Sequence, residues 1–139
     1  MITYTFDAEK VGNWVCEKAG GGYTHLCTAI GIEIDGILQA AVMYENFTGG
    51  NICMVWRVDN PNAITRKFYW MAFDYPFNQL KVNRVTGIVR EDNFKAIKVN
   101  TKLGFQQEFV LKQFLKDCDA IVFVMFKEQC KFIKGKRYD

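Results

Sequence analysis

The chain has 139 residues, of which 50% are hydrophobic, 15% aromatic and 24% charged, and its formal net charge is +3. This length is typical of one domain, and the 3 tryptophans, 6 tyrosines and 12 phenylalanines are enough for a packed core, which excludes a disordered chain and a disulfide-stapled miniprotein. The sequence contains no serine and a single histidine, His25. A Ser-His-Asp triad and a site with several histidine ligands are therefore excluded, so any chemistry must use carboxylates, Tyr, Cys, Asn, Thr or backbone amides.

The excess positive charge lies near the C-terminal end. Residues 1–126 carry equal numbers of cations and anions, whereas residues 127–139 hold five cations and two anions. We therefore predict one domain over residues 1–126, followed by a basic tail over residues 127–139. Such a tail can attract nucleic acid or another anionic surface, although a solvated terminus is the simpler interpretation.

The cysteines indicate a reducing environment. The five cysteines are Cys16, Cys27, Cys53, Cys118 and Cys130. Their number is odd, they show no CxxC spacing, and most of them stand among apolar residues. A zinc ribbon or a redox motif is not indicated, and buried thiols of this kind behave as small hydrophobic groups. We predict a cytoplasmic protein without membrane contact, because no signal peptide and no apolar run of about 18 residues is present.

The N-terminal half has the pattern of a strand, a helix and three further strands. These elements are predicted over residues 1–6, 7–20, 26–33, 37–45 and 52–58. Asp7 is a typical helix cap, and the glycines that follow the helix end it. Asp35-Gly36 is a strong hairpin signal, so the three later strands form an antiparallel meander.

A different pattern begins at Asn60-Pro61, where an N-cap residue and a proline in the first helical position predict a helix start. Pro76 is expected to kink this helix or to end its regular part. The later elements are a strand over 84–89, a helix over 93–102, and strands over 108–115 and 120–126. A βαβ unit places strands 52–58 and 84–89 parallel. The order β-α-β-β-β-α-β-α-β-β with a mixed sheet is therefore an α/β (α+β) fold.

The predicted helix start at residues 60–64 is a candidate anion site. Its first free amides, those of Asn62, Ala63 and Ile64, would point outward together with the positive end of the helix dipole. Such an arrangement can hold a phosphate or pyrophosphate, and Arg66 would add a positive charge. An ordinary capped helix without a ligand is the alternative interpretation.

The C-terminal half resembles the GNAT acyltransferases, and most closely their ribosomal-protein N-acetyltransferase branch. That branch typically reads N-x-x-(S/A)-I-(R/K)-V-L-E-K-L-G-F, and nine positions of this chain match it: Asn93, Ala96, Ile97, Lys98, Val99, Lys102, Leu103, Gly104 and Phe105. Residues 74–80 are also similar to the end of the family's long helix. Short GNAT-like proteins with eroded motifs occur in tailed bacteriophages, which this compact chain also resembles.

The resemblance implies acetyl-CoA as co-substrate, held in a V between strands 52–58 and 84–89. Backbone groups of Trp56, Arg57 and Val58 would pair with the pantetheine arm. The amides of Asn62, Ala63 and Ile64, together with Arg66, would hold the pyrophosphate. The side chain of Asn93 would form a hydrogen bond to the pantetheine.

The resemblance also implies direct transfer of acetyl to a primary amine on a small molecule or a protein. The position at which many members carry a tyrosine that protonates the departing thiolate is Asn100 here. Glu45, at the end of its strand, is the preferred candidate for the general base, and Asp59 is the other. The glycines of the family's pyrophosphate loop fall on Pro61 and Ala63, where proline removes a donor and Cβ atoms crowd the approach.

Three functional hypotheses stay open at this point. The first is an N-acyltransferase, and the second is a catalytically degenerate GNAT-fold structural or adaptor protein with weak or no CoA binding. The third is a nucleic-acid binder that uses the basic residues 131–137. The aromatic residues at 68–70 and 73 are predicted to join a helix to the sheet rather than to stack on bases.

Overall fold

The computed structural model describes residues 1–135 as seven strands and three helices. The strands are β1 Ile2–Thr5, β2 Thr28–Ile34, β3 Ile37–Glu45, β4 Asn51–Val58, β5 Arg84–Arg90, β6 Gln106–Leu111 and β7 Ala120–Phe126. The helices are α1 Ala8–Ala19, α2 Arg66–Asp74 and α3 Phe94–Leu103, with short helical turns η1 Pro61–Ala63, η2 Tyr75–Gln79 and η3 Lys127–Gln129. This order confirms the predicted succession of strands and helices.

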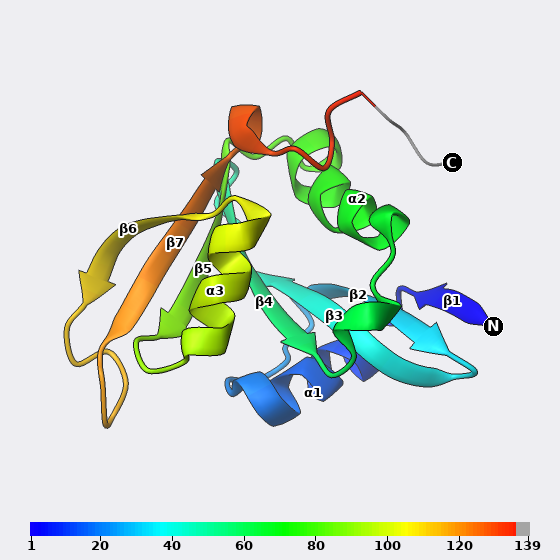
Figure 1. Cartoon of the computed structure of the whole chain (residues 1–139), viewed down its shortest axis with the longest axis horizontal. Coiled ribbons are helices and arrows are strands. Elements are labelled where there is room, and N and C mark those ends of the chain that lie inside the picture. Colours follow the sequence, from blue (N-terminus) through cyan, green and yellow to red (C-terminus); the bar gives the residue numbers. More distant parts are fainter. Residues whose placement is uncertain (136–139) are drawn as a thin grey trace.

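The strands form one mixed sheet in the order β1-β2-β3-β4-β5-β7-β6 (Figure 1). Only the central pair, β4 and β5, is parallel, as the βαβ unit predicted, and the other neighbours in the described chain are antiparallel. α1 covers one face over β2, β3 and β4, whereas α2 and α3 cover the other face (Figure 1).

Strand β3 explains why both faces need helices. Its even-numbered residues Ala40, Val42 and Tyr44 are buried beneath α2, and Ala41 and Met43 are buried beneath α1. Successive side chains of a strand point to opposite faces, so a continuous apolar run buries both. The central strands are therefore a two-sided core, and no helix within residues 1–135 is long and apolar enough to span a membrane.

Helix α2 begins at Arg66, so the predicted start at Pro61 is wrong. Asn60 caps only the turn η1, and Ile64 then adopts an extended backbone with ψ of 118°. Thr65 is the N-cap of α2, because its hydroxyl accepts a hydrogen bond from the amide of Phe68 at 3.1 Å. Tyr4 of β1 also bonds that hydroxyl at 2.8 Å, which fixes the helix start against the edge strand.

Pro76 ends the regular part of α2, as predicted, and the chain continues as one π-helical turn, η2. The carbonyl of Ala72 lies four residues before Pro76 and so lacks its α-helical donor, because proline has no N–H. The hydroxyl of Tyr44, fully buried on β3, donates to that carbonyl at 2.5 Å. Burial, and to a smaller degree the nearby Tyr75, raise the pKa of Tyr44 well above its ordinary value, so the hydroxyl remains a donor.

The end of the chain differs from the sequence prediction in two places. Strand β6 stops at Leu111 rather than at residue 115, because Gln113 takes a positive φ of 55° and its amide donates to Asp119 at 2.7 Å. In the region predicted as a basic tail, Cys130 is buried and Phe132 stacks on Phe73 with ring centroids 5.1 Å apart. The tail residues Lys136, Arg137 and Asp139 lie outside the described residues.

We expect Tyr44→Phe to lower the free energy of unfolding by about 1–3 kcal/mol, because it leaves a buried carbonyl without a donor. Urea unfolding measures this loss. The matched control is Tyr75→Phe, which removes only a 3.3 Å contact with Thr28 near the surface. In a Pro76→Ala background the restored N–H can donate to the Ala72 carbonyl. The loss of unfolding free energy caused by Tyr44→Phe should then be smaller than in the wild-type background. An equal cost in both backgrounds would show that the Ala72 bond is not the cause.

Candidate active site

Strands β4 and β5 pair over only part of their lengths. The pairs run from Asn51 opposite Arg84 to Cys53 opposite Thr86, and no described pair joins the two strands beyond them. Both strands nevertheless continue, β4 to Val58 and β5 on to Arg90, and their far ends diverge (Figure 1). The sheet therefore opens into a V between its two central strands.

The V exposes two strand edges whose backbone groups have no strand partner on that side. β4 is bonded to β3 as far as Val58 opposite Ala40, and β5 is bonded to β7 along its whole length. Of these two strands, only the edges that face each other across the V remain unpaired, and such edges present alternating N–H and C=O groups. The backbone of Trp56, Arg57 and Val58, predicted to contact pantetheine, lies on one of these edges.

The side chain of Trp56 points to the face covered by α2. Its ring packs 6.2 to 6.4 Å from those of Phe68, Tyr69 and Phe73. The indole Nε1 is buried and finds no hydrogen-bond acceptor among residues 1–135. A buried donor without a partner is rare and calls for an explanation such as a missing ligand.

Arg57 points to the opposite face and has a structural role there. Its guanidinium lies 3.9 Å above the Trp14 ring, donates to the Trp14 carbonyl at 2.7 Å and pairs with Asp59 at 2.9 Å. The hydrogen bond from Arg57 lowers the pKa of Asp59, which makes this carboxylate a weaker base. Asp59 caps neither η1 nor α2, whose caps are Asn60 and Thr65.

The amides predicted to bind phosphate are engaged within the turn η1. Asn62 donates to the Asn60 side chain at 3.2 Å, Ala63 to the Asn60 carbonyl at 3.1 Å and Ile64 to the Pro61 carbonyl at 3.3 Å. The expectation that these three amides are free is therefore wrong. The displaced helix start is the reason, because the extended residue at 64 turns residues 61–63 into a closed 3-10 turn.

The open end of α2 lies one turn further along the chain. The amides of Arg66 and Lys67, at the first two helical positions, have no intrahelical acceptor. The side chain of Arg66 is exposed at this position. Lys67 instead turns toward β1, where its ammonium lies 5.4 Å from the centre of the Tyr4 ring.

Helix α3 flanks the other side of the V, and both of its predicted site residues bond within the helix. Asn93 is the N-cap and accepts a hydrogen bond from the Ala96 amide at 3.1 Å. Asn100 donates its side-chain amide to the Ala96 carbonyl at 3.0 Å. Gly104 ends the helix with a φ of 109°, which a glycine tolerates without strain.

Glu45 ends β3, one strand away from the apex of the V, on the face opposite α2 and α3. It stands opposite Cys53 on β4, and Cys53 stands opposite Thr86 on β5. Residues directly opposite each other in neighbouring strands project to the same face, so the three side chains form a row across the sheet. Burial, together with the charge of Glu45, raises the pKa of the thiol of Cys53 despite its hydrogen bonds from asparagine side chains. The Cys53 thiol is therefore protonated at neutral pH.

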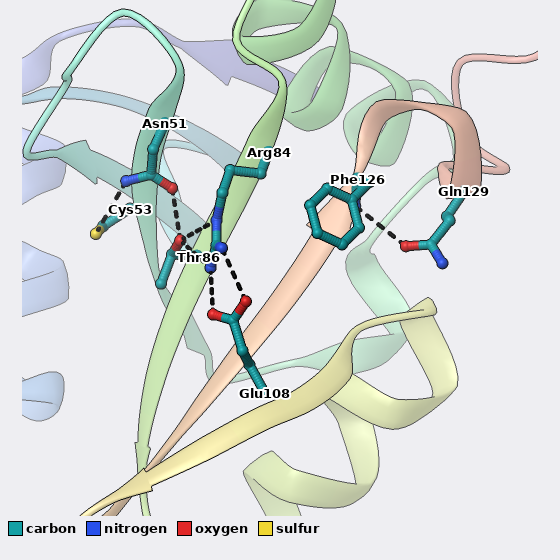
Figure 2. A network of polar contacts seen from close by, with 7 residues as sticks. All are labelled: Asn51, Cys53, Arg84, Thr86, Glu108, Phe126 and Gln129. Atoms are coloured by element: carbon teal, nitrogen blue, oxygen red, sulfur yellow. Dashed lines mark hydrogen bonds and ion pairs between the residues drawn. The ribbon is translucent and has the colours of Figure 1, made fainter.

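A polar network joins Cys53 and Thr86 of this row to strand β6 (Figure 2). Thr86 donates to the side chain of Asn51, whose amide contacts the sulfur of Cys53 at 3.9 Å. The guanidinium of Arg84 donates to the Thr86 hydroxyl and forms a two-pronged ion pair with Glu108 at 2.7 and 2.9 Å. Sequence reasoning did not find this network. Arg84 and Thr86 sit two residues apart on one face of a strand, which was an available signal, but Glu108 reaches them only through an irregularity in the β6–β7 register.

His25 is exposed in the turn between α1 and β2. Within residues 1–135 no group of three histidine, cysteine, aspartate or glutamate side chains is arranged to hold a metal ion. All five cysteines lie in this range and are free thiols. Phe68 and Phe73 are fully buried and Tyr69 packs against the same core, as predicted, whereas Trp70 lies outside that core.

No protein-family profile and no curated protein matches the sequence. Solved structures do match. The ribosomal-protein-S5-alanine acetyltransferase of Vibrio fischeri is 16% identical, with a TM-score of 0.71 over 94% of this chain and 95% of that chain. A mutant of the spermidine N-acetyltransferase SpeG of Vibrio cholerae is 13% identical, with a TM-score of 0.75 over 96% of each chain. A probable acetyltransferase is 18% identical, with a TM-score of 0.64 over 75% of this chain and 63% of that chain.

These similarities and the V between β4 and β5 define the class: the chain has the GNAT acetyltransferase fold. The predicted fold is therefore confirmed. Structures of a ribosomal-protein acetyltransferase and of spermidine acetyltransferases both match over nearly the whole chain, and their identities to it are low.

We expect the Arg84–Glu108 pair to make stability depend on acid pH. Hydrogen bonds from Arg84 lower the pKa of Glu108 below its ordinary value of 4.5. The pair therefore stabilises the fold above that value, and this contribution is lost as pH falls through the lowered pKa. Urea unfolding from pH 7 to pH 3 should show the stability difference between the wild type and Glu108→Gln narrowing in acid. A constant difference would contradict this, and Glu91→Gln, an exposed carboxylate without an ion pair among the described residues, is the control.

Proposed function

We propose that this protein is an acetyl-CoA-dependent N-acetyltransferase that acts on a primary amine of a small molecule or a protein. The observation that carries the proposal is the V between β4 and β5, whose open backbone edges suit the amide-containing pantetheine arm. The low-identity acetyltransferase structures support the same class of reaction. Fold similarity alone does not establish an activity, and it is the residues of the V that favour this one.

Three features of the V fit acetyl-CoA. The open edge of β4 at Trp56 to Val58 offers N–H and C=O groups to a ligand that lies along it as an added strand. The orphaned indole N–H of Trp56 offers a donor for a carbonyl of that ligand. The amides of Arg66 and Lys67, with the exposed Arg66 guanidinium, provide positive potential at the start of α2 for a pyrophosphate. The anion contacts therefore move from the predicted Asn62–Ile64 to the next turn.

The proposed transfer is a direct attack of the acceptor nitrogen on the thioester carbonyl carbon. A C–N bond forms, the C–S bond breaks, and the sulfur leaves as thiolate and takes a proton. Glu45, on β3 opposite Cys53, is proposed to remove the proton from the attacking nitrogen. An acyl-cysteine at Cys53 is disfavoured, because the raised pKa keeps this thiol protonated and only a thiolate is a good nucleophile. The carboxamide of Asn100 is a poor proton donor, so the proton for the thiolate comes from water.

One observation favours the competing hypothesis of a degenerate GNAT-fold protein. The amides of residues 62–64 donate hydrogen bonds within the turn η1, and proline at position 61 removes a further donor. Fewer backbone donors would then face the pyrophosphate than a glycine-rich loop provides. Binding of the co-substrate separates the two hypotheses directly.

We expect acetyl-CoA to stabilise the protein against heat. At about 100 times its dissociation constant a ligand adds about 2.7 kcal/mol, which shifts the melting temperature of a domain of this size by about 8 °C. Thermal unfolding with acetyl-CoA and with CoA measures this shift. No shift at millimolar concentrations of either compound would overturn the proposal and leave the degenerate protein as the better interpretation.

Variants at the V should separate binding from folding. Trp56→Phe keeps an aromatic ring in the cluster but removes the orphaned donor together with part of the packed ring, so the free protein should lose some stability. The acetyl-CoA shift should nevertheless fall. Arg66→Gln should also reduce the shift, and Lys116→Gln, in the distant β6–β7 loop, is the charge-matched control. Equal shifts in all these variants would place the ligand elsewhere.

We expect Glu45→Gln to bind acetyl-CoA as the wild type does but to transfer acetyl about 10²–10⁴-fold more slowly. The measurement is CoA release with a panel of primary amines, over a range of pH. Thr48→Ala, in the loop after β3, controls for general disturbance of this region. An unchanged rate in Glu45→Gln would rule out this residue as the base.

A further inference from the structure

A second cavity lies on the other side of α2, away from the V. Its volume is about 770 Å³, within the range of small-molecule sites. The walls come from β1, β2, the start of α1, α2 and η2, and their larger apolar side chains are Tyr4, Phe6, Ile30, Trp70, Met71 and Tyr75. No residue of β4, β5 or α3 lines it. The cavity is therefore separate from the proposed transfer site.

Asp74 is the feature that gives this cavity a chemical preference. Its side chain lines the cavity, yet the residue is only 8% exposed. Its two oxygens accept hydrogen bonds from the neutral amides of Asn78 at 2.8 Å and Gln79 at 2.9 Å. No cation among residues 1–135 forms an ion pair with it, whereas Glu33, equally buried, pairs with Lys10 at 3.2 Å. Buried carboxylates are normally paired with a cation.

The polar groups around Asp74 are further hydrogen-bond acceptors and not cations. Gln79 gives its amide nitrogen to Asp74, so its carbonyl oxygen remains for another donor. The hydroxyls of Thr28 and Tyr75, 3.3 Å apart, lie on the same cavity wall. An ammonium group has three donors and no acceptor, and it matches this set. The aromatic walls would in addition attract a cation by their ring faces.

The opposite end of the cavity has the opposite charge. Lys67 lies seven residues before Asp74 on α2, so two helical turns, or about 10 Å, separate them along one side of the helix. Both side chains line the cavity. A second cationic group on the ligand would therefore meet Lys67 and be repelled. The cavity selects a single positive charge attached to an apolar body.

We propose that this cavity binds a monocationic arylalkyl primary amine, with its ammonium on Asp74 and its ring between the aromatic side chains of β1, α2 and η2. The proposal does not depend on acetyl transfer, because the site shares no residue with the V. It gives the protein a small-molecule site in addition to the proposed co-substrate site.

Titration calorimetry of the whole chain with phenethylamine tests the proposal. We expect saturable binding of one molecule, at least about tenfold tighter than that of the neutral phenethyl alcohol, the anionic hydrocinnamate or the dicationic para-xylylenediamine. Asp74→Asn should weaken phenethylamine binding by about tenfold or more, because it removes a charge-assisted hydrogen bond. Glu91→Gln, the exposed carboxylate without an ion pair among the described residues, should bind it as tightly as the wild type.

A second variant keeps the test valid if Asp74→Asn fails to fold. Thr28→Phe fills the cavity from β2 without touching the buried carboxylate, and it should abolish binding while the melting temperature stays near that of the wild type. The absence of saturable binding, equal binding by Asp74→Asn or Thr28→Phe in folded form, or tighter binding of para-xylylenediamine would each overturn the proposal.

Discussion

The packing of Phe73 is the contact on which the rest of the structure depends. This fully buried ring of α2 lies 6.2 Å from Trp56 of β4, 6.1 Å from Phe105 before β6, and 5.1 Å from Phe132 beyond β7. Backbone hydrogen bonds join the two halves of the sheet over only three residue pairs. Side-chain packing around the Phe73 ring therefore holds the two halves of the sheet together where β4 and β5 are not paired. The V can exist for this reason without loss of the fold.

The V and the second cavity both depend on where α2 packs on the sheet. Its N-terminus is fixed by Thr65 and Tyr4 against β1, and its C-terminal end is fixed by Tyr44 and the proline turn. One side of the helix then faces the diverging strands, and another side faces β1 and β2. The same helix thus contributes Arg66 to the proposed pyrophosphate contact and Asp74 to the proposed amine contact.

The sequence predicted most of the fold because local signals and the global fold agree. The Asp35-Gly36 hairpin, the Asn93 cap and Gly104 each specify one structure, and all three occur as predicted. The start of α2 was not predictable, since Asn60 and Thr65 are both good caps and a bond from Tyr4, distant in sequence, selects the second. The site residues stay a prediction: the register puts Glu45 one strand away from the apex of the V, and Glu108 enters the network through a register shift that no local pattern reveals.

The short β4–β5 contact also has a mechanical consequence. The five residues of β4 beyond the last pair extend about 16 Å, so a rotation of about 10° between the two half-sheets would displace the far end of the V by about 3 Å. Such a rotation would break no hydrogen bond between β4 and β5, because none crosses the V there. The three β4–β5 pairs would be the hinge of such a rotation, and the side chains packed around Phe73 hold the width of the V.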